Sequence, residues 1–89
     1  MKYKDYYTIE TVNAEAKNDE ITRKYKQLLF KTEFKHFIAG KLGIKKESFE
    51  RHLIYNTYPK KHIDTLLHHL NNQLKFDEKV KEIQTKRYN

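Results

Sequence analysis

Apolar residues repeat at spacings of three and four through most of this chain, and Gly43 and Pro59 divide the pattern into segments. Such spacing places apolar side chains on one face of an α-helix. Glycine favours the left-handed backbone conformation that ends many helices, and proline is well tolerated in a helix's first turn. The sequence therefore predicts a mainly α protein, built as a small bundle of four to five helices.

Four helical segments follow from this pattern. Asp19 is expected to cap the first, and Thr32, followed by Glu33, to cap the second. The third is expected over 46–55, and the fourth follows the proline, with a polar interruption at 76–78. The side chains expected to face the core are Ile21, Tyr25, Leu28 and Leu29; Phe34, Phe37, Ile38 and Leu42; Phe49 and Leu53; and Ile63, Leu66, Leu67, Leu70 and Leu74.

The start of the chain has a different character. Residues 3–12 are rich in Tyr, Thr and β-branched residues, which is typical of a short extended arm or strand. Residues 13–18 are small and polar, which indicates a turn or a frayed helix start. We therefore expect an N-terminal arm at 1–18, a helical domain at 19–75 and a C-terminal helical extension at 76–89.

Length and composition exclude several classes of protein. With 89 residues, the chain accommodates one small domain, which leaves little room for an internal catalytic cavity. It has no cysteine, and therefore no disulfide scaffold, thiol nucleophile or Cys-ligated zinc. The five histidines match no recognised metal-ligand spacing, and the only serine, Ser48, lies in no nucleophile motif. We expect no catalytic activity, cofactor or metal.

The apolar runs of the sequence are short. The longest have three residues, far below the roughly 18 that a membrane span needs. No apolar block follows the first lysines, as it would in a signal peptide. The expected location is the cytoplasm, without contact to a membrane.

Positive charge is concentrated in the middle of the chain. The whole chain has a net charge of +7, whereas residues 21–61 carry eleven Lys and Arg against three Glu, a net charge of +8. Such a surplus fits a lysine-rich solvated surface. It also fits a polyanionic partner, because Lys and Arg that neutralise phosphates release condensed counterions. Composition alone does not separate the two.

The segment 34–53 carries the most specific pattern in the chain. Two helices that cross steeply over a short turn need a small residue where their backbones approach, and Ala39 is at that position. Gly43 suits the turn itself. The apolar residues that would hold both helices are Ile38, Leu42, Ile44, Phe49 and Leu53. This pattern resembles the DNA-binding helix-turn-helix of phage Cro and C1 repressors and their XRE-like bacterial relatives. Residues 55–63 look, more loosely, like that family's loop into its next helix.

The resemblance implies a small basic protein that binds double-stranded DNA, as a transcriptional regulator of phage or mobile-element type. In that family the second helix of the motif, here about 46–55, enters the major groove. Carried over residue by residue, the positions facing DNA would be Lys45, Lys46, Glu47, Ser48, Glu50 and Arg51, and the phosphate contacts Lys35, Lys41, Lys60 and Lys61.

Two carboxylates on that face favour an alternative function. Glu47 and Glu50 would repel phosphates, although one Glu can accept a hydrogen bond from cytosine. The alternative is a protein-interaction module, such as a small phage-encoded inhibitor or adaptor of a host protein, that reuses a helix-turn-helix-like fold; an RNA-binding role is a third reading. The long leucine-rich last helix also favours a homodimer, by analogy with repressors that bind paired half-sites.

Overall fold

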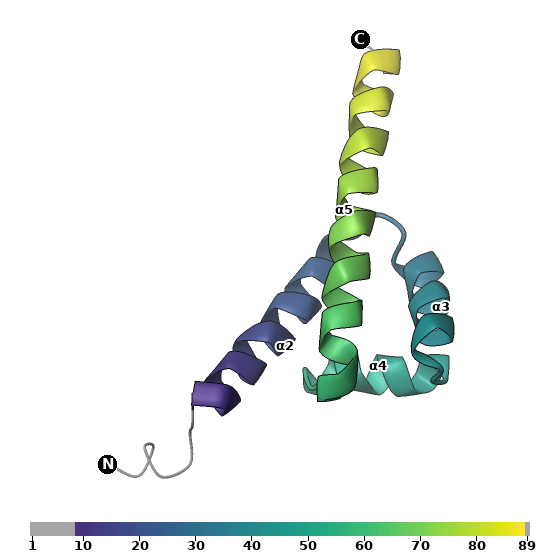
Figure 1. Cartoon of the computed structure of the whole chain (residues 1–89). Coiled ribbons are helices and arrows are strands. Elements are labelled where there is room, and N and C mark those ends of the chain that lie inside the picture. Colours follow the sequence, from purple (N-terminus) through teal and green to yellow (C-terminus); the bar gives the residue numbers. More distant parts are fainter. Residues whose placement is uncertain (1–8, 89) are drawn as a thin grey trace.

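In the computed structural model, which describes residues 9–88, the chain forms four α-helices and no strand within that range. They are α2 (Ile9–Gln27), α3 (Lys31–Leu42), α4 (Lys46–Tyr55) and α5 (Lys60–Tyr88) (Figure 1). α2 packs mainly against α5, and α3 contacts both α4 and α5. The C-terminal part of α5 projects beyond the other helices (Figure 1). The prediction of an all-helical fold is confirmed.

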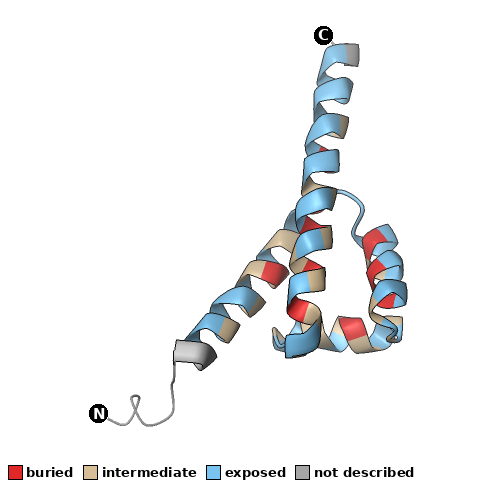
Figure 2. Ribbon diagram, in the orientation of Figure 1, coloured by how far each residue is buried: buried red, intermediate tan, exposed pale blue. Residues whose placement is uncertain are grey.

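The hydrophobic core lies where the inner faces of the helices meet (Figure 2). Its buried side chains are Ile21, Leu28, Phe34, Ile38, Ala39, Phe49, Tyr58, Ile63, Leu66 and Leu70. Most of them were predicted from the helical spacing. The prediction of burial is wrong for two residues: Leu29 is 41% exposed and Phe37 is 47% exposed. Leu29 lies beyond the end of α2, where the helical phase is lost, and Phe37 lies at the edge of the contact between α3 and α5, where its ring packs against that of His69.

α2 begins earlier than the sequence predicts. Residues 9–12 are helical and not extended, and residues 13–18 continue the same helix, so Asp19 lies in its interior and caps nothing. Packing of α2 against α5 overrides the local preference for an extended chain. The predicted arm at 1–8 lies outside the described residues. The expected boundaries at 18/19 and 75/76 both fall inside continuous helices.

The connection between α2 and α3 is fixed by contacts that the sequence pattern did not indicate. Phe30 occupies the position before α3 without a side-chain cap, so the prediction that Thr32 caps this helix is wrong. The Lys31 ammonium donates to the Leu28 carbonyl at 2.8 Å, and the Tyr25 hydroxyl donates to the Lys31 carbonyl at 3.2 Å. The first bond gives a partner to a carbonyl just past the end of α2, and the second ties the start of α3 to α2.

α5 runs through residues 76–78 without a break, so the predicted interruption is wrong. Asp77 is 2% exposed, and its two carboxylate oxygens accept hydrogen bonds from the Leu29 N–H at 3.0 Å and from Gln73 Nε2 at 3.1 Å. This polar residue therefore faces inward and ties α5 to the connection between α2 and α3.

Replacing Asp77 with alanine is expected to lower the free energy of unfolding by about 1–2 kcal/mol, because the Leu29 N–H loses its partner. The effect stays at the lower end of the usual range because Leu29 is partly exposed and water can replace part of the bond. The measurement is urea unfolding followed by circular dichroism. Glu78→Ala removes the same charge from an exposed neighbour, and equal losses in the two variants would contradict the role of Asp77.

The stability of the folded protein is expected to depend on pH through the His69 side chain. Partial burial lowers its pKa, and the charges of His68 and Lys41 act in the same direction. The folded protein therefore takes up this proton less readily than the unfolded chain. Stability is expected to be fully present above a pH of about 6.5 and to fall as the pH drops through the pKa of the folded state. Urea unfolding at about pH 7.5 and about pH 5 measures the effect, which His69→Gln should reduce; an undiminished pH dependence in that variant would contradict it.

Candidate nucleic-acid interface

The turn between α3 and α4 is built around Gly43, whose φ of 69° lies in the left-handed region. Its N–H donates to the Gly40 carbonyl at 3.3 Å, and the Ile44 N–H donates to the Ala39 carbonyl at 3.0 Å. A Cβ at Gly43 would meet nothing within 4 Å, so the glycine is needed for its backbone conformation and not for space. Ala39 is buried beside this turn, as predicted for a small residue.

The first part of α4 presents several of the predicted site residues together. Lys45, Glu47, Ser48 and Arg51 line one open groove with Gly43 and Ile44 of the turn. Lys45, Glu47 and Arg51 are exposed and Ser48 is half-buried. Residues that follow one another at helical spacing thus form a continuous surface with two cationic groups, one carboxylate and one hydroxyl.

Two predicted site residues bind each other. The Lys35 ammonium on α3 lies 3.0 Å from a carboxylate oxygen of Glu50 on α4. This hydrogen bond is the main reason that the pKa of Glu50 lies below its usual value, and the charges of Lys35, Lys46 and His36 also favour the ionised carboxylate. The same bond raises the pKa of Lys35. The pair links the two helices at the surface, where the Lys35 side chain is 20% exposed and the Glu50 side chain 41% exposed.

Lys35→Met is expected to raise the pKa of Glu50 toward its ordinary value, because the ammonium that stabilises the carboxylate is gone. NMR titration of the Glu50 side-chain carboxyl measures this shift. For a surface that binds DNA, the variant should also bind the duplex more weakly, since the uncovered carboxylate would repel phosphates.

Adding Glu50→Gln to the Lys35→Met variant is expected to restore most of the lost DNA affinity, as an electrophoretic mobility shift with the same duplex would show. If Lys35 contacted a phosphate directly, the double variant would still lack that contact, and its affinity would stay well below that of the wild-type protein. Failure of the rescue would therefore contradict the pairing role.

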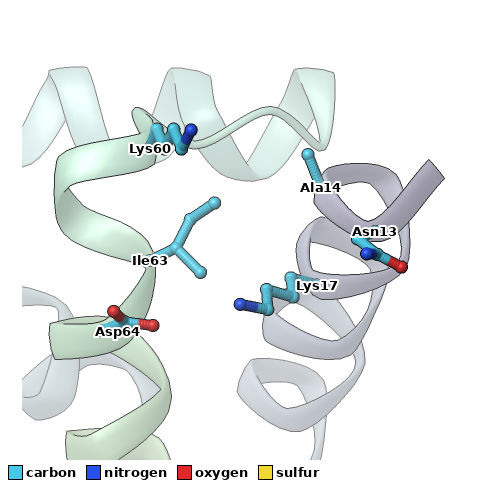
Figure 3. Close-up of a pocket in the computed structure, with 6 residues that line it drawn as sticks. All are labelled: Asn13, Ala14, Lys17, Lys60, Ile63 and Asp64. Carbon is cyan, nitrogen blue, oxygen red and sulfur yellow. The ribbon is translucent and has the colours of Figure 1, made fainter. Parts of the chain in front are cut away.

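The remaining predicted contacts lie apart from this groove. The Lys41 ammonium lies 5.7 Å from the centre of the Phe37 ring, a distance typical of a cation–π contact. Lys46 is half-buried at the start of α4, and Lys61 is exposed near the start of α5. Lys60 lines a pocket between α2 and α5 with Asn13, Ala14, Lys17, Ile63 and Asp64 (Figure 3). The structure thus places Lys60 toward α2.

A hydrogen-bond network at the other end of α4 was not foreseen. Asn56 follows α4 with a left-handed φ of 53°, which asparagine tolerates. Its side chain accepts a bond from the Thr22 hydroxyl and donates one to Asp19 of α2. The Thr22 hydroxyl also shares a hydrogen bond of 2.6 Å with the Tyr58 hydroxyl. The sequence indicates that an asparagine tolerates positive φ. Its hydrogen-bond partners lie on a helix that is distant in sequence, so no local pattern predicts them.

The groove at the start of α4 contains no group with an assigned chemical activity. Within the part of the chain that the structure describes, no three His, Asp or Glu side chains lie close enough together to hold a metal ion. None of the helices described combines the length and apolar character needed to cross a bilayer. Comparisons with protein-family models, curated proteins and solved structures found no match to this chain.

Proposed function

We propose that this protein binds double-stranded DNA sequence-specifically, with α3, the turn at 43–45 and α4 acting as a helix-turn-helix of the Cro and C1 type. The groove at the start of α4 carries the proposal, because it gathers Lys45, Ser48 and Arg51 on one exposed surface. In DNA-binding proteins of this type, the first residues of the second helix reach the base edges.

The side chains of the groove suit distinct contacts in the major groove. Arg51 can donate two hydrogen bonds to a guanine, and the Ser48 hydroxyl can donate to or accept from several bases. Glu47 can accept from the amino group of a cytosine. In this proposal, Lys45 and Lys46 at the start of α4 pair with phosphates of the duplex, and Lys41 and Lys61 supply further phosphate contacts.

The pairing of Lys35 with Glu50 supports DNA as the partner. An unpaired Glu50 would repel phosphates, and its presence favoured the alternative of a host protein. The ion pair engages this carboxylate, and Glu50 does not line the groove at the start of α4. That groove contains one carboxylate, Glu47, together with the positive charges of Lys45 and Arg51.

A homodimer fits the projecting part of α5. Phe76 is 54% exposed and Ile83 is 58% exposed, and half-buried Val80 lies between them at spacings of four and three. Apolar side chains at this spacing form a stripe that a second helix can cover. A dimer of this kind would present two copies of α4 to half-sites about one helical turn, or ~34 Å, apart.

Selection from a random pool of duplexes at physiological salt tests the proposal. The expected result is enrichment of one short sequence, which then shifts with the purified protein at nanomolar to micromolar concentration. Competition with structured RNA of equal length separates DNA from RNA binding. A pool that remains random through repeated rounds would overturn the proposal and favour the host-protein alternative, for which a stoichiometric partner that survives nuclease treatment is the expected sign.

A further inference from the structure

A second open groove lies between α2 and the C-terminal half of α4, on residues that the DNA-binding proposal does not use. Its α2 wall is formed by Asp19, Thr22, Arg23 and Lys26, and its α4 side by Leu53, Ile54 and Asn56. The two grooves have no residue in common, although α4 contributes to both.

Three of these residues are joined by hydrogen bonds between their side chains. The Thr22 hydroxyl donates to Oδ1 of Asn56 at 2.5 Å, and Nδ2 of Asn56 donates to the Asp19 carboxylate at 2.5 Å. Polar groups that already have partners gain little from a ligand, because a new bond would replace an existing one. These polar side chains, including the Asp19 carboxylate, therefore have hydrogen-bond partners without a ligand.

The other residues of the groove lack such partners. Ile54 is 76% exposed, the highest value among the large hydrophobic side chains that the structure describes, and Leu53 beside it is half-buried. Arg23 and Lys26 are exposed, and neither forms an ion pair within the described residues. A partner that covers these two aliphatic side chains removes apolar area from water. The charged residues of the groove are Arg23, Lys26 and Asp19, which give it a net charge of +1.

We infer that this groove binds a segment of another protein that presents apolar side chains flanked by Asp or Glu. The apolar side chains would cover Leu53 and Ile54, and the carboxylates would pair with Arg23 and Lys26, as charge complementarity across an interface requires. An amphipathic helix laid into a groove between two helices is one established mode of such binding. Nucleic acid fits less well, because the phosphate backbone has no apolar group to cover two aliphatic side chains.

A displayed library of random short peptides, selected on the purified full chain, supplies the probe. The expected consensus combines apolar residues with Asp or Glu. The most enriched peptide, synthesised with a fluorescent label, should bind Ile54→Asp at least about tenfold more weakly in fluorescence anisotropy, because the contact loses buried apolar area. Val12→Asp is the matched control, since Val12 is 52% exposed near the start of α2, does not line this groove and should leave peptide binding unchanged.

Charge reversal tests the second half of the inference. In Arg23→Glu combined with Lys26→Glu, the selected consensus should change from acidic to basic flanking residues. A consensus without acidic residues on the wild-type protein, or peptide binding that Ile54→Asp leaves intact, would overturn the inference. It would also be overturned if Ile54→Ser, which adds no charge, abolished DNA binding or a dimer seen by sedimentation, since the groove would then belong to nucleic acid or to a second copy.

The outcome is independent of the proposed DNA binding. Arg51→Ala changes the groove at the start of α4 and should leave peptide affinity unchanged, whereas Ile54→Ser, which adds no charge to α4, should weaken peptide binding and leave the DNA shift unchanged. Failure of one function therefore does not obscure the other.

Discussion

Replacing Phe49 with alanine is expected to lower the free energy of unfolding by about 3–5 kcal/mol, the largest change for any single residue considered. Phe49 is fully buried, and it is the one buried side chain of α4. Its ring centre lies 5.8 Å from that of Tyr25 and 6.5 Å from that of Tyr58. The truncation would remove these aromatic contacts and leave a cavity where α4 joins the core.

The loss is large for a domain of this size, whose total stability is expected at about 5–15 kcal/mol. α4 has 10 residues, too few for a helix that is stable on its own, so its position depends on this anchor. Urea unfolding of Phe49→Ala measures the effect, and Phe49→Leu, which keeps most of the apolar volume, should lose clearly less. A loss below about 1 kcal/mol in Phe49→Ala would show that the core does not depend on this contact.

Replacing Arg51 with alanine is expected to weaken binding to the selected duplex by about 1–3 kcal/mol, or about 5- to 150-fold, and to relax the preference at one base pair. Arg51 is exposed and lines, with Lys45 and Ser48, the groove that is proposed to face the base edges. A phosphate contact would behave differently, since its loss weakens binding to all sequences about equally.

Arg23→Ala is the matched control for this variant. Arg23 is also exposed, but it lies on α2 and lines the groove between α2 and α4. It should leave the base preference unchanged. Repeating the duplex selection with each variant measures the preference directly. An unchanged consensus in Arg51→Ala, or an equal change in Arg23→Ala, would contradict base reading by α4.

Local signals made the centre of this fold predictable. Gly43 ends α3 with the left-handed conformation expected of it, and α4 spans the predicted residues 46–55. The spacing of apolar residues in α5 also identifies its buried face, including Leu66 and Leu70. In each case, the information lies within a few residues of the position that it determines.

Contacts between distant residues were not predictable in this way. A polar interruption of the last helix was predicted at 76–78, which includes Asp77. Asp77 is instead buried, and its carboxylate accepts a hydrogen bond from Leu29, 48 positions earlier. The start of α2 has extended and turn-like composition, and packing against α5 keeps it helical. The ion pair between Lys35 and Glu50 changes the interpretation of the candidate site, because both residues were expected to contact DNA separately.

The dependence of DNA affinity on salt tests the proposed DNA binding most directly. With the selected duplex, the logarithm of the association constant should fall linearly with the logarithm of salt concentration. If Lys41, Lys45, Lys46 and Lys61 each neutralise a phosphate, the slope should be about −3 to −4 for each bound chain. Affinity that does not change with salt, or no binding to any duplex at low salt, would contradict DNA binding by this surface.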